Sequence, residues 1–225
     1  MKKVIVFDLD DTLSKEIDYL ESAYKEIANY AVQKCVECAG PVDELAVKAY
    51  DAMLVAHHKG ENVFEALNAY LGLSTPVKVY LDVYRNHKPT LRLKDDARAC
   101  LDQLKAKGCV IGIISDGRSV QQRHKTEALG LDAWVQVEDY VISEEFGSEK
   151  PSLANYEYFM KRYPDAEGFV YVGDNLKKDF IAPNALGWET ICLKDDGRNI
   201  HKQDFEAASG DALPKRVISL LSEMV

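Results

Sequence analysis

The stretch Val4-Ile5-Val6-Phe7-Asp8-Leu9-Asp10-Asp11-Thr12-Leu13, residues 4–13, decides the fold of this chain. Its four apolar, β-prone residues predict a short buried strand. The strand ends in the carboxylates Asp8, Asp10 and Asp11. Because carboxylates gathered at one strand end repel one another, we expect a positive charge or a metal ion close to them.

After this strand the chain has first a purely helical pattern of apolar residues and then a pattern in which helices and strands alternate. Apolar residues first recur at helical spacing, which predicts four helices, over residues 16–38, 43–57, 62–72 and 77–85. Further helices are then expected over residues 95–107, 121–129, 153–163, 177–186 and 214–224. Apolar runs separate most of these helices and predict strands within residues 109–114, 135–142, 168–172 and 189–193.

Strands that alternate with helices of this length indicate βαβ units. The sequence therefore predicts an α/β fold with a five-stranded parallel sheet. Nothing between the first strand and residue 89 has the pattern of a strand, so this stretch is an insertion. We expect a core domain of residues 1–14 and 89–225 and an inserted all-α domain of residues 15–88.

Composition excludes several classes of function. The net charge of −9 and the pI near 5.1 argue against nucleic acid as a partner, because nucleic-acid binders carry a basic surface. The apolar run that ends at Asp8 has only four residues, whereas a signal sequence needs about 7–15 and a membrane span about 20. We therefore expect a cytoplasmic protein without a membrane partner. The five cysteines, including Cys35 and Cys38, are expected to be reduced.

Polar residues follow the predicted strands at the points where the strands end. Asp8 and Asp10 follow the first strand, and Asp174 follows the run at residues 168–172. Ligands of open parallel sheets bind beyond the carboxyl ends of the strands, so these side chains are expected to meet. Because Asp8 and Asp10 are two residues apart, an extended backbone points both the same way.

Two further segments bring hydrogen-bond donors to the same edge. The run at residues 109–114 ends in Ser115-Asp116-Gly117, and Lys150 follows the third predicted strand. Ser115 and the backbone N–H groups of Asp116 and Gly117 suit a phosphoryl group, and Lys150 suits its negative charge. Each residue alone has a structural alternative: Ser115 or Asp174 as a helix cap, Lys150 as a surface charge. Their shared position after successive strands favours a common site.

Phosphoryl transfer is the chemistry that these groups share. One aspartate can attack phosphorus, and the other can exchange a proton with the leaving oxygen and with water. Several carboxylates would repel a phosphate ester unless a hard cation lay between them. Oxygen ligands of this kind predict Mg²⁺.

Four motifs resemble those of the haloacid dehalogenase-like (HAD) superfamily. Residues 8–13 are similar to its first motif, D-x-D-x-[TV]-[LV], and residues 114–117 to its second, an apolar strand that ends in Ser or Thr. Lys150-Pro151 resembles the third motif, and residues 173–179 resemble the fourth, G-D-x-x-x-x-D. The resemblance implies a Rossmann-like core and a magnesium-dependent enzyme, and residues 15–88 would then be a helical C1 cap.

Site roles follow from the resemblance by motif position. Asp8 would be the nucleophile and Asp10 the general acid/base, while Ser115 and Lys150 would hold the phosphoryl group. The dehalogenases of the family lack the second aspartate, so the presence of Asp10 favours phosphate chemistry. The implied metal ligands are Asp8, the backbone carbonyl of Asp10, Asp174 and, directly or through water, Asp179.

The resulting hypothesis is a phosphatase that acts on a small phosphomonoester through an aspartyl-phosphate. A sugar phosphomutase of the same superfamily and a non-catalytic binding protein on the same fold remain as alternatives. Arg118 is interpreted as a solvated residue at a helix start, or else as a contact to a second anionic group of the substrate. His57 and His58, with Asn62, are interpreted as an exposed turn or as substrate contacts. The sequence makes no prediction of the oligomeric state.

Overall fold

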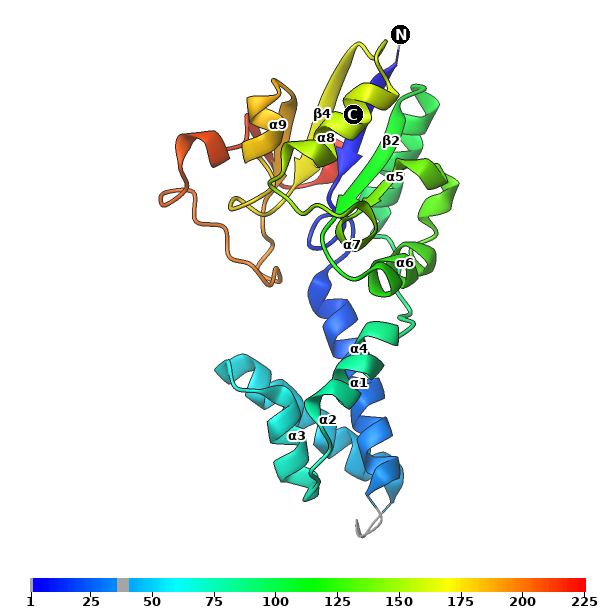
Figure 1. Cartoon of the computed structure of the whole chain (residues 1–225), viewed down its shortest axis with the longest axis vertical. Coiled ribbons are helices and arrows are strands. Elements are labelled where there is room, and N and C mark those ends of the chain that lie inside the picture. Colours follow the sequence, from blue (N-terminus) through cyan, green and yellow to red (C-terminus); the bar gives the residue numbers. More distant parts are fainter. Residues whose placement is uncertain (1, 36–40) are drawn as a thin grey trace. The chain divides into compact units, whose positions relative to one another are not determined.

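The computed structural model describes residues 2–35 and 41–225 of the chain (Figure 1). Its strands are β1 (Lys3–Phe7), β2 (Val110–Ser115), β3 (Tyr140–Ile142), β4 (Gly168–Gly173), β5 (Glu189–Leu193) and β6 (Arg216–Ile218). Its α-helices are α1 (Glu16–Lys34), α2 (Val42–Lys59), α3 (Val63–Leu71), α4 (Val77–Asn86), α5 (Asp95–Ala106), α6 (Ser119–Ala128), α7 (Ser143–Phe146), α8 (Leu153–Arg162) and α9 (Ile181–Ala185).

The strands form one sheet in the order β3-β2-β1-β4-β5-β6, and every pairing is parallel. This confirms the predicted α/β fold with a parallel sheet. The helix predicted over residues 214–224 is wrong, because Arg216–Ile218 pairs with β5 and a 3₁₀ turn follows at Leu221–Met224. The helix predicted over residues 177–186 is limited to α9.

Apolar side chains of the sheet fill two separate cores, one on each face. Along β1, Ile5 and Phe7 belong to the core that α5 covers, whereas Val4 and Val6 belong to the core that α8 covers. This division follows from the strand period of two, because successive side chains point to opposite faces. A strand covered on both faces is apolar throughout, which is the pattern of residues 4–7.

The position of β1 in the sheet places the carboxylates. The chain runs from β1 outward to β2 and β3, and then returns to the other side of β1 as β4. Asp8 therefore follows β1 at the point where the strand order reverses, and Asp174 follows the neighbouring β4. Doubly wound sheets bind ligands in the crevice at this reversal point.

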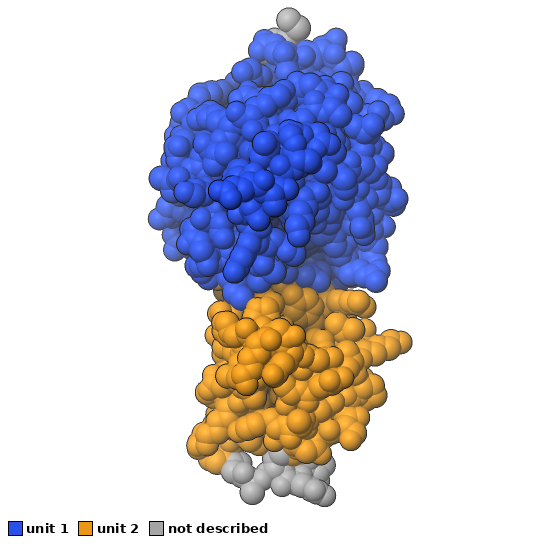
Figure 2. Space-filling view, turned by 90° about the vertical axis from the view of Figure 1, so that its left-hand side faces the viewer, with its two compact units in different colours: residues 1–17, 91–225 blue, residues 18–90 orange. Residues whose placement is uncertain are grey.

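The chain divides into two compact units, residues 1–17 with 91–225 and residues 18–90 (Figure 2). The second unit consists of most of α1 together with α2, α3 and α4. Asn62, one of the possible substrate contacts, is the N-cap of α3, and its side chain accepts hydrogen bonds from the backbone N–H groups of Phe64 and Glu65. His57 and His58 lie in the last turn of α2.

The cysteines differ from expectation at one position. Cys35 is disulfide-bonded, so the expectation of a reduced thiol there is wrong. An odd number of cysteines does not exclude one disulfide bond. The number of cysteines therefore cannot predict whether a single pair is bonded. Cys38 lies outside the described residues, while Cys100, Cys109 and Cys192 are free thiols. No helix in the described ranges is long and apolar enough to cross a membrane.

Candidate active site

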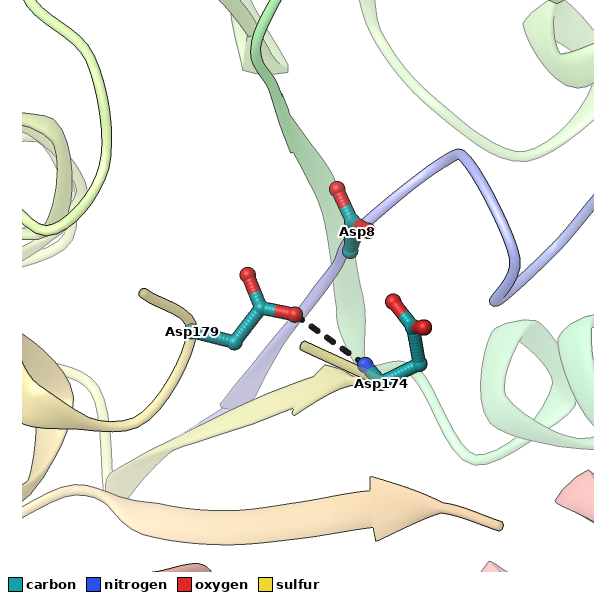
Figure 3. Close-up of side chains that lie close together, drawn as sticks. All are labelled: Asp8, Asp174 and Asp179. Carbon is teal, nitrogen blue, oxygen red and sulfur yellow. Dashed lines mark hydrogen bonds between the residues drawn. The ribbon is translucent and has the colours of Figure 1, made fainter. Parts of the chain in front are cut away.

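Three buried aspartates meet beyond the ends of β1 and β4. Oxygen atoms of Asp8, Asp174 and Asp179 all lie within 4.8 Å of one another (Figure 3). Asp8 directly follows β1 and Asp174 directly follows β4, whereas Asp179 returns to the cluster from the turn before α9. Gly173 allows Asp179 to approach this closely, because a Cβ atom at residue 173 would lie 2.4 Å from Asp179 Oδ2.

Lys150 supplies the positive charge that the first motif requires. Its Nζ atom lies 2.6 Å from Asp8 Oδ1 and 2.7 Å from Asp179 Oδ1. It also donates a hydrogen bond to the Tyr171 hydroxyl at 3.2 Å. Burial by itself would lower the pKa of Lys150, but Asp179 and Asp8 raise that pKa well above its usual value. The lysine is therefore a permanent cation inside the cluster.

One lysine does not balance three carboxylates. Burial raises the pKa of Asp8 to about 7, although Lys150 opposes the rise. Burial, together with the charges of Asp8 and Asp179, raises the pKa of Asp174 to about 9. Without a further cation, the cluster therefore retains protons at neutral pH.

Asp179 holds the backbone after β4 and Lys150 in place within the cluster. Its Oδ2 atom accepts hydrogen bonds from the backbone N–H groups of Asp174, at 3.0 Å, and Asn175, at 2.8 Å. Its Oδ1 atom pairs with Lys150. Because both oxygens are engaged in this way, Asp8 and Asp174 are the carboxylates best placed to receive a cation. Their donor atoms are oxygens, as Mg²⁺ prefers, so the residues present fit this ion.

Asp10 lies in a second polar network, apart from the aspartate cluster. Its Oδ1 atom lies 2.7 Å from Nζ of Lys125, and its Oδ2 atom accepts a hydrogen bond from Nε2 of Gln122 at 2.8 Å. Lys125 is buried and also pairs with Glu16. Both Gln122 and Lys125 come from α6, which follows the second motif.

The two carboxylates of this network have opposite pKa shifts. Burial would raise the pKa of Asp10, but the charge of Lys125 and hydrogen bonds from Glu16, Lys125 and Gln122 lower it. Burial and the charge of Asp10 raise the pKa of Glu16 to about 8. The Asp10–Glu16 pair therefore holds one proton at neutral pH, on Glu16.

The second motif lies beside Asp10. Gln122 Nε2 donates to the Ser115 hydroxyl at 2.8 Å, which joins Ser115 to the Asp10 network. The Asp116 carboxylate accepts from the backbone N–H of Lys150 at 3.0 Å and from Nζ of Lys178 at 2.8 Å. The backbone N–H of Gly117, expected to face a phosphoryl group, instead donates to the Ser143 hydroxyl at 3.0 Å.

A cavity of about 230 Å³ opens beside both networks. Its lining includes Asp8, Asp10, Asp174 and Lys178. Arg118 is not among the lining residues; it is half-exposed and pairs with Glu144 at 2.6 Å. The cavity therefore gives a small ligand access to both Asp8 and Asp10 from a single space.

Sequence reasoning does not identify Gln122, Lys125 or Glu16 as site residues. A lysine in a helix normally lies in solvent, and only the fold shows that Lys125 is buried against Asp10. One weak signal is available: Gln122 and Lys125 are three residues apart, so they share one face of a helix that follows the second motif.

Comparison with known proteins establishes the family. The family model described as haloacid dehalogenase-like hydrolase matches residues 2–187 of the chain. The chain belongs to the haloacid dehalogenase-like hydrolases. The resemblance inferred from the four motifs is thereby confirmed.

Curated relatives of this HAD-like hydrolase carry phosphatase names. A glyceraldehyde 3-phosphate phosphatase of Methanocaldococcus jannaschii is 31% identical, over 100% of this chain and 96% of that protein. A protein of the same name from Pyrococcus furiosus is 33% identical, over 85% of this chain and 80% of its own. A ribulose-1,5-bisphosphate 5-phosphatase of Halopiger xanaduensis is 29% identical, over 60% of this chain and 56% of its own.

Solved structures show the same fold at lower identity. The magnesium-bound HAD hydrolase YfnB of Bacillus subtilis has a TM-score of 0.66 at 20% identity, covering 99% of this chain and 96% of that one. A 2-haloacid dehalogenase of Pseudomonas syringae has a TM-score of 0.63 at 20% identity, covering 100% and 96%. Since hydrolases of different chemistry share this fold, the fold alone does not decide the reaction of the HAD-like hydrolase.

Proposed function

We propose that the protein is a magnesium-dependent phosphatase that hydrolyses a small phosphomonoester through an aspartyl-phosphate on Asp8. One observation carries the proposal: Asp8 and Asp10 face one cavity but belong to separate networks, the first with Lys150 and the second with Lys125. Phosphatase chemistry needs one aspartate to attack and the other to move protons. The names of the curated relatives support the same class of reaction.

In the first step, a carboxylate oxygen of Asp8 forms a bond to phosphorus while the bond from phosphorus to the ester oxygen breaks. Asp10 gives to the departing oxygen, which leaves as an alcohol, a proton that Glu16 passes to it through their hydrogen bond. The proton that the Asp10–Glu16 pair retains at neutral pH is the one that this step requires. Lys150 and Ser115 hold the phosphoryl oxygens during the transfer.

In the second step, water attacks the phosphorus of the aspartyl-phosphate, and the bond between Asp8 and phosphorus breaks. Asp10 accepts the proton of the attacking water, which restores the protonated pair with Glu16 and releases inorganic phosphate. Hydrogen bonds from Lys125 and Gln122 keep Asp10 directed for both transfers. Because the same residue acts as acid and then as base, its supporting network must tolerate both charge states.

Asp8, Asp174 and the backbone carbonyl of Asp10 are the proposed ligands of Mg²⁺, and Asp179 braces them. When bound, the ion supplies positive charge that offsets repulsion between the carboxylates and the phosphate ester. The helical unit, predicted from the sequence as residues 15–88, is proposed as the cap that selects the substrate.

Phosphate release from a panel of metabolite phosphates tests the function, and glyceraldehyde 3-phosphate is the first substrate to examine. We expect activity with Mg²⁺, none after chelation with EDTA, and recovery when Mg²⁺ is added back. Isomerisation of a sugar phosphate without release of phosphate would instead support a mutase. Activity undiminished by thorough chelation would contradict the proposed metal.

The nucleophile is tested by Asp8→Asn, which preserves the shape of the side chain and removes the attacking oxygen. We expect no detectable turnover of an aryl phosphate from a folded protein. Asp165→Asn is the matched control, because Asp165 is exposed and precedes β4 at the opposite end of the strand from Asp174. Turnover at the wild-type rate by Asp8→Asn would refute the assignment.

A further inference from the structure

The loop after β5, residues 194–203, reaches the aspartate cluster although no recognised motif lies in it. Nδ2 of Asn199 donates a hydrogen bond to Asp174 Oδ2 at 2.8 Å. Nε2 of Gln203 donates to the backbone carbonyl of Asp174, also at 2.8 Å. The β5–β6 loop therefore holds Asp174 by both its side chain and its backbone.

We propose that Asn199 is a positioning residue, which orients the Asp174 carboxylate so that its other oxygen, Oδ1, receives a divalent cation. This inference rests on the metal site of the proposed function. Within the described part of the chain, nothing donates a hydrogen bond to Asp174 Oδ1, and Asp174 lines the cavity. An amide suits this position because it donates a hydrogen bond without adding a positive charge that would repel the cation.

Lys15 determines which end of the Asn199 amide faces Asp174. The buried Lys15 donates through Nζ to Oδ1 of Asn199. An ammonium group has three donors and no acceptor, so it can face only the oxygen of the amide. The NH₂ group of Asn199 is thereby turned toward Asp174. Lys15 thus acts on the carboxylate through Asn199.

Acidic residues anchor both Lys15 and the loop. Asp196 lies 2.8 Å from Nζ of Lys15 and 3.0 Å from Nζ of Lys94, which directly precedes α5. Beyond Asn199, the backbone N–H of Ile200 donates to Asp11 Oδ2 at 2.9 Å. The loop is therefore joined to the first motif at Asp11 and to Lys15, two residues beyond the motif. This explains how a segment outside the four motifs can hold one of their carboxylates.

Metal affinity of Asn199→Ala tests the proposal without any reference to turnover. Binding of Mn²⁺ to the whole protein is measured from the loss of the free-ion electron paramagnetic resonance signal. We expect the dissociation constant to rise roughly 10- to 100-fold, the usual effect of removing a partner of a metal ligand. Lys202→Ala is the matched control, because Lys202 is exposed in the same loop, and we expect its affinity to be unchanged.

Lys15→Met shows whether Lys15 acts on metal binding by orienting Asn199 or only through its positive charge. Loss of a lysine near a cation site would strengthen metal binding if charge alone acted. Loss of the contact that orients Asn199 should instead weaken it, and we expect weaker binding. If Asn199→Ala does not fold, as judged by circular dichroism, Lys15→Met decides the question.

An Asn199→Ala protein that folds and binds Mn²⁺ within about twofold of the wild type would overturn the inference, given the larger losses expected of such partners. Tighter binding by Lys15→Met would also overturn it. A wild-type protein that binds Mn²⁺ but hydrolyses no phosphate ester would refute the proposed function and leave this inference intact. A wild type that binds no Mn²⁺ would refute the inference itself.

Discussion

Removal of divalent cations should make the protein less stable as the pH rises. Without a bound cation, burial raises the pKa of Asp174 to about 9 and that of Asp8 to about 7, against an ordinary value of 3.8. The folded state therefore keeps protons that the unfolded chain has already released. A raised pKa contributes stability that is complete below the unfolded pKa and is lost as the pH rises toward the folded one.

The size of the effect follows from one extra proton on Asp174. Between about pH 5.5 and pH 7.5, Asp174 is protonated in the folded state and ionised in the unfolded state. One such proton changes the free energy of unfolding by about 1.4 kcal/mol per pH unit, so Asp174 alone removes about 2.7 kcal/mol over this window. Asp10, whose pKa is lowered, adds the opposite slope only at more acidic pH.

Urea unfolding across this window, in EDTA and in Mg²⁺, measures the effect. We expect the free energy of unfolding in EDTA to fall as the pH rises, and the fall to be smaller in Mg²⁺ because the cation replaces the protons. Asp174→Asn should make the slope in EDTA shallower by about 1.4 kcal/mol per pH unit. A metal-free stability that stays level or rises, or an Asp174→Asn protein with the wild-type slope, would refute the reasoning.

Three other substitutions test the unit formed by residues 1–17 and 91–225. Lys125→Met should lower the free energy of unfolding by about 3–5 kcal/mol, because it leaves Asp10 and Glu16 without their shared cation. An unchanged midpoint of urea unfolding would contradict this. Asp10→Asn should lower kcat roughly 10²- to 10⁴-fold for an alkyl phosphate. The decrease should be smaller for 4-nitrophenyl phosphate, because its leaving group needs no proton. Equal decreases in kcat for the two substrates would argue against an acid role of Asp10. Gly112→Ala should lower the free energy of unfolding by about 1–3 kcal/mol, because the new Cβ atom would lie 2.3 Å from Phe159 Cε1. A midpoint of thermal unfolding equal to that of the wild type would show that Phe159 moves aside.

The sheet was predictable because most of its strands are buried on both faces. Such strands are apolar at every position and are bounded by glycine or charge, as residues 4–7 and 168–173 are. The edge strand β6 lacks this signal. Only Ile218 of its three residues is buried, and its pairing with β5 is a tertiary contact. A short segment of this kind can equally be read as the face of an amphipathic helix.

The candidate site was predictable where residues follow strands, and not elsewhere. The positions of Asp8 and Asp174 follow from the sheet topology, because neighbouring parallel strands bring their carboxyl ends together. Lys125 and Asn199 act from a helix and from a loop, where sequence patterns do not reveal which neighbour a polar side chain contacts. Their partners lie 115 and 25 residues away in the chain, so only the folded structure identifies them.

The fold gives Asp8 and Asp10 different proton affinities although they are only two residues apart. Burial raises the pKa of Asp8 to about 7, and Lys150, which also pairs with Asp179, offsets only part of the rise. Lys125 lowers the pKa of Asp10. A bound cation would favour the ionised form of Asp8 that attack requires, and Glu16 holds the proton that Asp10 passes on. Two buried lysines from different segments thus turn one short motif into two functional groups.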